Sequence, residues 1–322
     1  MTEQVLILGA KGRFGRAASE AFSAAGWRVR AFARNWPQDA ARFGAELITG
    51  DAFDAEAVVS AAADCDVIVN ALNPPYPRWK RDVPRLTANV IAAAKTSGAA
   101  VFLPGNVYNY GAGMPEVLTE DTPHKPTARK GRLREEMEEA YAVAADAGVR
   151  TVIVRAGDFL EREKTGNWFD THIAAKAGRG RATYPGPRDR VHAWAYLPDL
   201  ARAMAELARL RAEFAMFETF GFEGYSLTGD ALIAAMEETL GRPLKVGGMP
   251  WPLIRALGLF SPQMREVAEM AYLWRVPHRI DGAKLAAALP DYRPTPLAEA
   301  MADALADHIA EPEPLEGATA AM

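Results

Sequence analysis

The sequence is poor in cysteine, and this shortage excludes two kinds of site. Cys65 is the single cysteine among 322 residues, so the chain cannot form an internal disulfide or offer a thiolate pair to a metal ion. The five histidines show no metal-ligand spacing. We therefore expect no metal site, and we expect Cys65 to pack near the start of a strand.

Long apolar runs and an excess of basic charge are also missing. No stretch of 18 apolar residues occurs, and the apolar run in MTEQVLILGA is too short for a secretory signal peptide, so we expect a cytoplasmic protein. The 37 basic and 41 acidic residues give a net charge of -4. This balance gives no global electrostatic reason to expect nucleic acid or an anionic membrane as a partner, and any basic patch must be local.

The first half of the sequence alternates short apolar runs with helical segments. The runs, each typical of a buried strand, lie at 4–8, 27–33, 45–49, 66–72, 99–104 and 150–155. The helical segments lie at 13–25, 54–62, 83–97 and 127–147. This alternation predicts an α/β fold with a Rossmann-type, doubly wound parallel sheet.

The rhythm changes after residue 155. A Gly/Pro-rich stretch at 176–190 precedes a helix near 197–211 and a strand near 216–222, and helices dominate from there to about residue 310. Ser261 stands before Pro262, which is the pattern of an N-cap followed by the first helical position.

The strongest chemical signal is the segment VLILGAKGRFGRAASEAF, in which Gly9, Gly12 and Gly15 lie between a strand and a helix. Glycines are needed there because the backbone must turn tightly and approach a pyrophosphate, whose charge then rests on the helix N-terminus. This context predicts a dinucleotide site that includes Lys11, Arg13 and Phe14 of the same loop.

The spacing G-x-x-G-x-x-G resembles that of the short-chain dehydrogenase/reductase superfamily, in its extended branch of NAD-dependent epimerases and dehydratases. Further similar segments follow in order, namely GDAFD (50–54), NAL (70–72), LTANVIAAAKTSGAAVFL (86–103), TVIVRAGDF (151–159) and WAYLPDLARAM (194–204). The resemblance implies that Asp51 meets the adenine and that 70–72 line the cofactor ribose. It adds to the cofactor site Asp51, Ala52, Ala71, Leu72 and Asn89.

We expect two domains and a tail. A dinucleotide-binding Rossmann domain takes up 1–155, and 191–222 returns to it. Residues 156–310 form a smaller, mainly helical lobe on the substrate side. Residues 311–322 are rich in Pro, Glu and Ala without periodicity, so we expect a disordered tail.

The end of the second strand decides the choice of cofactor. A carboxylate there binds the ribose hydroxyls of NAD, whereas an arginine accommodates the 2′-phosphate of NADP. Arg34 occupies this position, and Arg13 could reach the same phosphate. The sequence therefore favours NADP over NAD, with two solvated arginines as the alternative interpretation.

The catalytic pattern departs from that of the family. Pro104 and Gly105 replace the serines that usually end the fifth strand, and in KGRLREEME (130–138) Lys130 and Arg134 stand where the family has its tyrosine and lysine. A guanidinium cannot supply a proton. Lys130 could, because the nearby Arg134 and the helix N-terminus both favour a lowered lysine pKa.

Other residues compete for a role in the chemistry. Tyr108 and Asn106 follow the fifth strand and could donate to a substrate carbonyl, whereas Arg155 and Asp158 could contact the substrate where the sixth strand enters the cleft. The helix start PTARKGRLREEMEE carries its basic residues first, although a helix N-terminus favours negative charge. We expect this positive charge to be compensated by a cofactor phosphate or an acidic substrate. The alternative is that Glu136 and Glu138 neutralise it through i,i+4 pairs with Arg132 and Arg134.

Two classes of function follow from these observations. The first is an atypical NAD(P)-dependent oxidoreductase or epimerase-like enzyme that acts on a small carbonyl or sugar-like substrate, with an anionic substrate as one option. The second is a non-catalytic NADP-binding redox sensor or scaffold, because relatives that lost the Tyr/Lys pair include such proteins. Extended members often dimerise through the helices equivalent to 83–97 and 127–147, so a homodimer is one expectation and the oligomeric state stays open.

Overall fold

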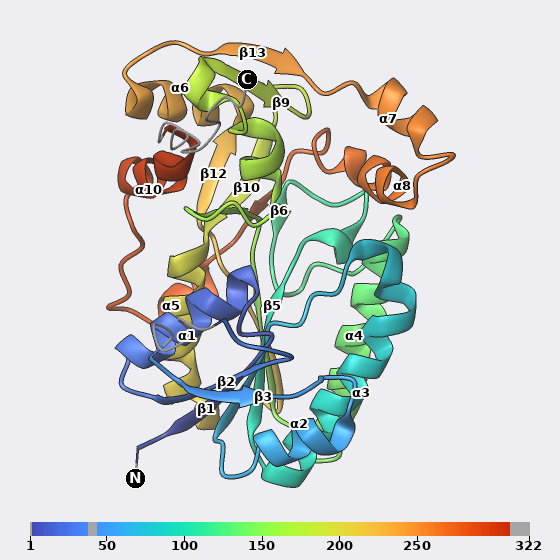
Figure 1. The fold of residues 1–322 in the computed structure, drawn as a ribbon, viewed down its shortest axis with the longest axis vertical. Helices are drawn as coiled ribbons and strands as arrows, with labels where there is room; N and C mark the ends of the chain where they lie inside the picture. The colour runs from blue at the N-terminus through green and yellow to red at the C-terminus, as the bar shows by residue number, and fades with distance from the viewer. Residues whose placement is uncertain (1, 38–43, 310–322) are drawn as a thin grey trace, which may run out of the picture.

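A seven-stranded parallel sheet forms the centre of the computed structural model, which describes residues 2–37 and 44–309 (Figure 1). The strand order is β11-β7-β5-β4-β1-β2-β3. The strands are β1 Gln4–Leu8, β2 Arg28–Ala33, β3 Glu46–Thr49, β4 Val67–Asn70, β5 Ala100–Gly105, β7 Thr151–Arg155 and β11 Phe217–Gly221. The predicted doubly wound sheet is confirmed, with strand ends that shift by at most two residues. The predicted disordered tail lies outside the described residues.

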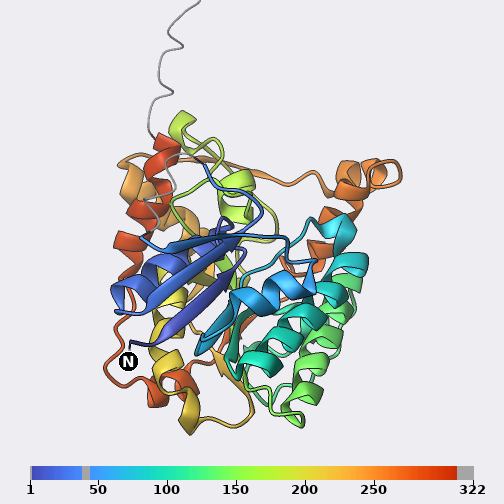
Figure 2. The ribbon, with the colours of Figure 1, turned by 60° about the horizontal axis from the view of Figure 1, so that its bottom comes forward.

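Helices cover both faces of this sheet (Figures 1 and 2). One face carries α1 Arg13–Ala24 and α5 Leu197–Arg209, and the other carries α2 Ala55–Ala61, α3 Trp79–Ser97 and α4 Arg129–Ala145. Their apolar residues recur every four positions, so that one stripe of each helix faces the sheet. On α4 this stripe consists of the buried Leu133, Met137 and Tyr141.

Helix α3 begins earlier than the sequence predicted. A 3-10 turn, η2 Tyr76–Arg78, leads directly into it. Trp79 is buried at its first position, and the indole Nε1 donates a hydrogen bond of 2.7 Å to Pro74 O. This contact ties the helix start to the loop after β4. The helix ends at Ser97, and Gly98 (φ +76°) forms its left-handed cap.

A second lobe lies beyond the carboxyl ends of the strands. It contains the predicted helices and also short strands of two to six residues, most of them too short to predict from periodicity. Its strands are β6 Val117–Leu118, β8 Asp158–Leu160, β9 Arg181–Tyr184, β10 Val191–Tyr196, β12 Tyr225–Thr228, β13 Lys245–Gly248 and β14 Arg279–Ile280. Its helices are α6 Gly229–Leu240, α7 Trp251–Leu257, α8 Pro262–Glu269 and α10 Leu297–Ile309, whereas α9 Ala283–Ala288 packs beside β11 of the central sheet.

Helices α7 and α8 form a hairpin at one corner of this lobe (Figures 1 and 2). We call residues 251–269 the α7–α8 hairpin. The predicted N-cap is confirmed, because Ser261 Oγ accepts a hydrogen bond from the Met264 amide. No helix of the described residues is long and apolar enough to cross a bilayer.

Candidate functional site

The glycine loop between β1 and α1 is closed by contacts that side chains would block. Gly9 has φ +78°, and a Cβ there would lie 2.9 Å from Ala71 O. A Cβ on Gly15 would lie 2.2 Å from Gly9 O, whereas one on Gly12 would lie at 3.2 Å. Gly12 has no side chain to cap α1, so the amide N–H groups of the first turn stay available to an anion.

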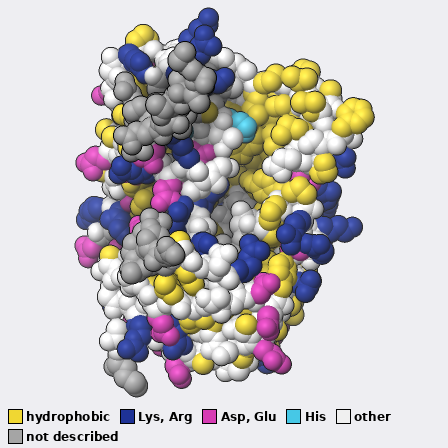
Figure 3. Space-filling view, viewed as in Figure 1, with side chains coloured by type: hydrophobic (Ala, Val, Ile, Leu, Met, Phe, Trp, Pro, Cys, Tyr) yellow, Lys and Arg dark blue, Asp and Glu magenta, His cyan; other side chains and the backbone are white. Residues whose placement is uncertain are grey.

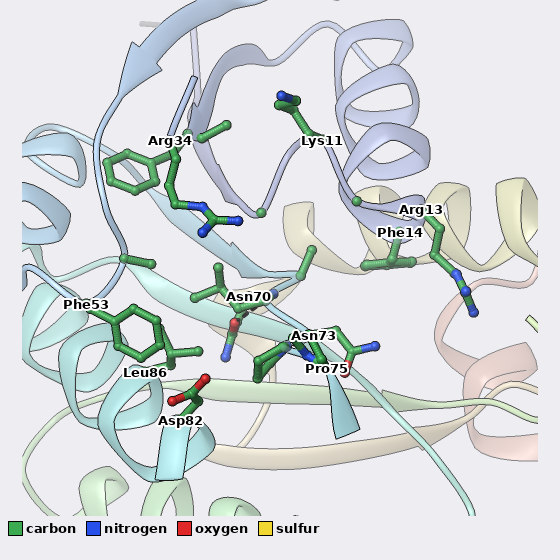
Figure 4. Close-up of a pocket in the computed structure, with 18 of the residues that line it drawn as sticks. Lys11, Arg13, Phe14, Arg34, Phe53, Asn70, Asn73, Pro75, Asp82 and Leu86 are labelled. Carbon is green, nitrogen blue, oxygen red and sulfur yellow. Dashed lines mark hydrogen bonds between the residues drawn. The ribbon is translucent and has the colours of Figure 1, made fainter. Parts of the chain in front are cut away.

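A cavity of about 510 Å³ opens beside this loop at the carboxyl ends of the central strands. We call it the cofactor cavity (Figure 4). The predicted residues that line it are Gly9, Lys11, Gly12, Arg13, Phe14, Arg34, Asp51, Ala52, Ala71 and Leu72. Gly15 and Asn89 are not among the lining residues. Gly15 packs under the loop, and Asn89 Nδ2 donates to Ala52 O at 2.8 Å and so positions one wall.

The basic residues of the cofactor cavity lie at two separate ends (Figure 4). Arg34 is exposed and makes no hydrogen bond or ion pair with the described residues, and Lys11 Nζ donates to the neighbouring Asn35 Oδ1 at 2.6 Å. Arg13 points to the opposite end, where it donates to Thr165 O at 3.0 Å and lies 3.5 Å from Glu161 Oε1. Lys11, rather than Arg13, therefore accompanies Arg34.

A second cavity, also of about 510 Å³, adjoins the first. We call it the substrate cavity. The two share the loop 73–75 together with Arg13, Arg134 and Phe159. Apart from these, the substrate cavity is lined by aromatic side chains such as Trp79 and Trp168 and by residues of α8. The loop after β4 and the contribution of α8 were not predicted, although the pair Pro74–Pro75 marks a turn in the sequence.

Arg134 lies at the junction of the two cavities. Its guanidinium stacks over the Trp79 ring at 4.7 Å from the centroid, and its Nε has no hydrogen-bond partner among the described residues. Burial lowers the pKa of Arg134, against the opposing effect of Glu138, but a guanidinium remains protonated. A fixed positive charge therefore lies between the two cavities.

Tyr108 and Asn106 line the substrate cavity beside this charge. The Tyr108 hydroxyl lies 3.4 Å from that of Tyr76, and the Tyr108 amide donates to Asn106 Oδ1 at 2.9 Å. Burial raises the pKa of Tyr108 well above its ordinary value. The phenol thus stays protonated at neutral pH and is available as a donor. Tyr76 was not predicted.

Asp158 and Arg155, which we expected to contact the substrate, lie in different surroundings. Asp158 lines the substrate cavity, and its carboxylate lies 2.8 Å from His192 Nε2. Arg155 is buried away from both cavities, where it pairs with Glu138 at 2.7 Å and donates to Asn106 O at 2.6 Å. Arg155 thus holds the Asn106 backbone.

Lys130 does not line either cavity. Its side chain is 1% exposed, and Nζ donates to Glu266 Oε2 at 2.6 Å, to Glu266 O at 2.8 Å and to Glu269 Oε2 at 2.8 Å. The lowered pKa predicted for Lys130 is confirmed, but its main cause is burial, and the contributing like charge is Arg129 rather than Arg134. These contacts give Lys130 a structural place.

The anion at the start of α4 is supplied by the chain itself. The Arg129 amide donates to Glu269 Oε1 at 2.5 Å, and the Arg129 guanidinium pairs with Glu266. Burial alone would raise the pKa of Glu269, but the hydrogen bonds from Lys130 and Arg129 outweigh it and lower that pKa. The expectation of a cofactor phosphate or substrate at this helix start is corrected, and so is the pairing with Glu138, which instead binds Arg155. We call the group formed by Arg129 and Lys130 of α4 and by Glu266 and Glu269 of α8 the α4–α8 clamp.

Comparison with known proteins agrees with this geometry. A family model described as NAD(P)H-binding matches residues 9–191, more than half of the chain. The fold resembles those of a candidate epimerase from Burkholderia cenocepacia J2315 (22% identity, 96% of this chain and 99% of that chain, TM-score 0.76) and of UDP-N-acetylglucosamine 4-epimerase from Bacillus cereus (14%, 95% and 99%, 0.75). It also resembles UDP-glucose 4-epimerase from Brucella ovis in complex with NAD (16%, 96% and 98%, 0.75). At these identities the likeness concerns the fold alone. No curated protein matches the chain.

We predict that Gly12→Val folds but binds NADPH at least about tenfold more weakly, because a branched side chain would occupy the place of the pyrophosphate. The Cβ itself meets only Gly9 O, at 3.2 Å, a tight contact that a shift of a few tenths of an ångström relieves. Fluorescence titration of NADPH and thermal unfolding measure the two properties. Gly113→Val is the control, because a Cβ at Gly113 meets nothing within 4 Å. Retained affinity in Gly12→Val would show that the loop is only a turn.

We predict that Lys130→Met lowers the free energy of unfolding by about 3–5 kcal/mol, because it removes the buried one of the two cations that pair with the buried Glu266. NADPH affinity should change little, since Lys130 lines neither cavity. Denaturant unfolding measures the first and titration the second. Lys80→Met removes an exposed lysine from α3 and serves as the control. Equal stability of the two variants would contradict the clamp.

Proposed function

Since the chain belongs to the NAD(P)H-binding family, we propose that it is an NADP-dependent oxidoreductase that reduces a small carbonyl compound. The observation that carries this proposal is the substrate cavity of about 510 Å³ that adjoins the cofactor cavity at Arg134. A protein that only senses the cofactor needs no such space, and side chains would be expected to fill it.

The cofactor cavity favours NADP at its ribose end. Arg34 stands at the end of β2, where an acid would bind the ribose hydroxyls of NAD. Lys11 and Asn35 lie beside it, so that two cations and an amide face the position of a 2′-phosphate. Phe53 and Leu86 offer apolar surface at the same end to an adenine (Figure 4).

Tyr108 is the best placed proton donor in the substrate cavity. When bound, the reduced cofactor supplies a hydride to the carbonyl carbon, and the carbonyl oxygen then needs a proton. The neutral Tyr108 hydroxyl can donate that proton, Tyr76 can hydrogen-bond the resulting phenolate, and Arg134 stabilises the negative charge. The side-chain oxygen of Asn106 accepts a hydrogen bond from the Tyr108 backbone amide and so holds Tyr108 in place.

The walls of the substrate cavity favour a substrate with an apolar or aromatic body. Trp79, Trp168 and Met264 provide flat or flexible apolar surface, and Asp158 adds a carboxylate that would repel an anion. Nucleotide sugars are the second substrate class to test, because solved structures with this fold include nucleotide-sugar epimerases.

We predict that the wild type binds NADPH more tightly than NADH and that Arg34→Ala removes most of this preference. Charge-assisted contacts to a phosphate contribute on the order of 1.5–3 kcal/mol. Titration of both reduced cofactors measures the change, and Lys11→Ala should act in the same direction. Arg28→Ala, at the other end of β2, is the matched control. Equal affinities for the two cofactors in the wild type would refute the assignment to NADP.

We predict that Tyr108→Phe slows single-turnover oxidation of bound NADPH by about 10²–10⁴-fold at unchanged NADPH affinity, because it removes the proton donor. A library of aromatic and aliphatic carbonyls, with UDP-glucose alongside, identifies the substrate to use. Tyr110→Phe is the control, because Tyr110 belongs to the same turn as Tyr108 but lines neither cavity. Equal rates in both variants would exclude Tyr108. If nothing oxidises NADPH, the non-catalytic sensor becomes the better explanation.

A further inference from the structure

The α7–α8 hairpin carries most of the exposed large apolar side chains of the described residues. Leu253, Leu257, Leu259 and Phe260 are 57%, 46%, 73% and 88% exposed, and Val143 and Ile309 are the others of this kind. The hairpin that carries these four residues projects at a corner of the molecule (Figures 1 and 2), and Figure 3 shows an apolar area on that side. Such a concentration marks an interaction surface.

The hairpin has two distinct sides. Trp251 and Ile254 of α7 are buried in the lobe, whereas Leu253 and Leu257, four residues apart, share the outer side of that helix. Leu259 and Phe260 occupy the turn at its tip. The α4–α8 clamp fixes the base of α8, so the outer apolar side is held away from the lobe.

The exposed charge beside the apolar tip of the hairpin is basic. The hairpin carries two cations, Arg255 and Arg265, and both are exposed. The two acids of the hairpin, Glu266 and Glu269, lie in the clamp. The net charge of -4 therefore conceals a local basic and apolar surface, which is the combination that anionic lipid attracts.

We propose that the α7–α8 hairpin docks on an anionic lipid surface, with Leu257, Leu259 and Phe260 entering the headgroup region and Arg255 binding lipid phosphates. A projecting tip suits insertion into lipid. A stable protein interface buries roughly 800 Å² per partner, which is more than four partly exposed side chains can supply. This proposal does not depend on turnover. It revises the expectation, based on net charge, that no membrane is a partner.

The test is co-sedimentation of the full chain with vesicles of phosphatidylcholine that contain about 30% phosphatidylglycerol, compared with vesicles of phosphatidylcholine alone. We expect binding to the anionic vesicles only. The double variant Leu259→Ser/Phe260→Ser should bind at least about tenfold more weakly, since each buried apolar side chain contributes to partition. Arg255→Gln should weaken binding and reduce its dependence on salt.

Val143→Ser is the matched control, because Val143 is 71% exposed on α4, outside the hairpin. It should bind like the wild type. Thermal unfolding and NADPH affinity establish that each variant is folded. Failure of the wild type to bind anionic vesicles, or equal binding by the double variant, overturns the proposal. A concentration-dependent dimer in analytical ultracentrifugation, lost in the double variant, would assign the surface to a second copy and overturn it as well.

Discussion

The ionic contact between the start of α4 and the hairpin determines how the substrate side is built. Two cations in the first turn of a helix are unfavourable by themselves, and here Glu266 and Glu269 of α8 compensate Arg129 and Lys130. A buried charge without its partner costs several kcal/mol, so neither half of the clamp is stable alone. As a result, a short helix from late in the sequence is held against the Rossmann domain.

The two cavities depend on this arrangement in different ways. The cofactor cavity is built mainly by the strand ends and by the loops that follow them, with Gly9 packed against Ala71, and Asp82 and Leu86 of α3 complete it. The substrate cavity needs α8, because Met264 and Val267 supply part of its wall. Arg134 belongs to both, since its stacking on Trp79 holds a charge between them. The cofactor cavity is thus determined mainly by residues close in sequence, whereas the substrate cavity depends on the contact between α4 and α8, which lie far apart in the sequence.

This difference explains what could be predicted from the sequence. Strands, helices and the glycine loop follow from neighbouring residues, and ten of the residues predicted to bind the cofactor line one cavity. Lys130 was expected at the chemistry because it stands where the family has its tyrosine. Its partner Glu266 lies 136 positions away, and no local pattern reveals such a pair. Arg13 was assigned to the wrong end of the cavity for a similar reason, because its partners Glu161 and Thr165 come from the loop after β8.

The position of Lys130 and Arg134 on α4 has one further consequence. They are four residues apart, so the anchoring charge and the charge between the cavities lie on successive turns of the same rigid element. A molecule in the substrate cavity would contact α8, which carries Glu266 of the anchor, and one in the cofactor cavity would contact Arg134 on the adjacent turn. Thermodynamic linkage then requires reciprocity: if occupancy of one cavity tightens α4 against α8, occupancy of the other is strengthened by the same factor.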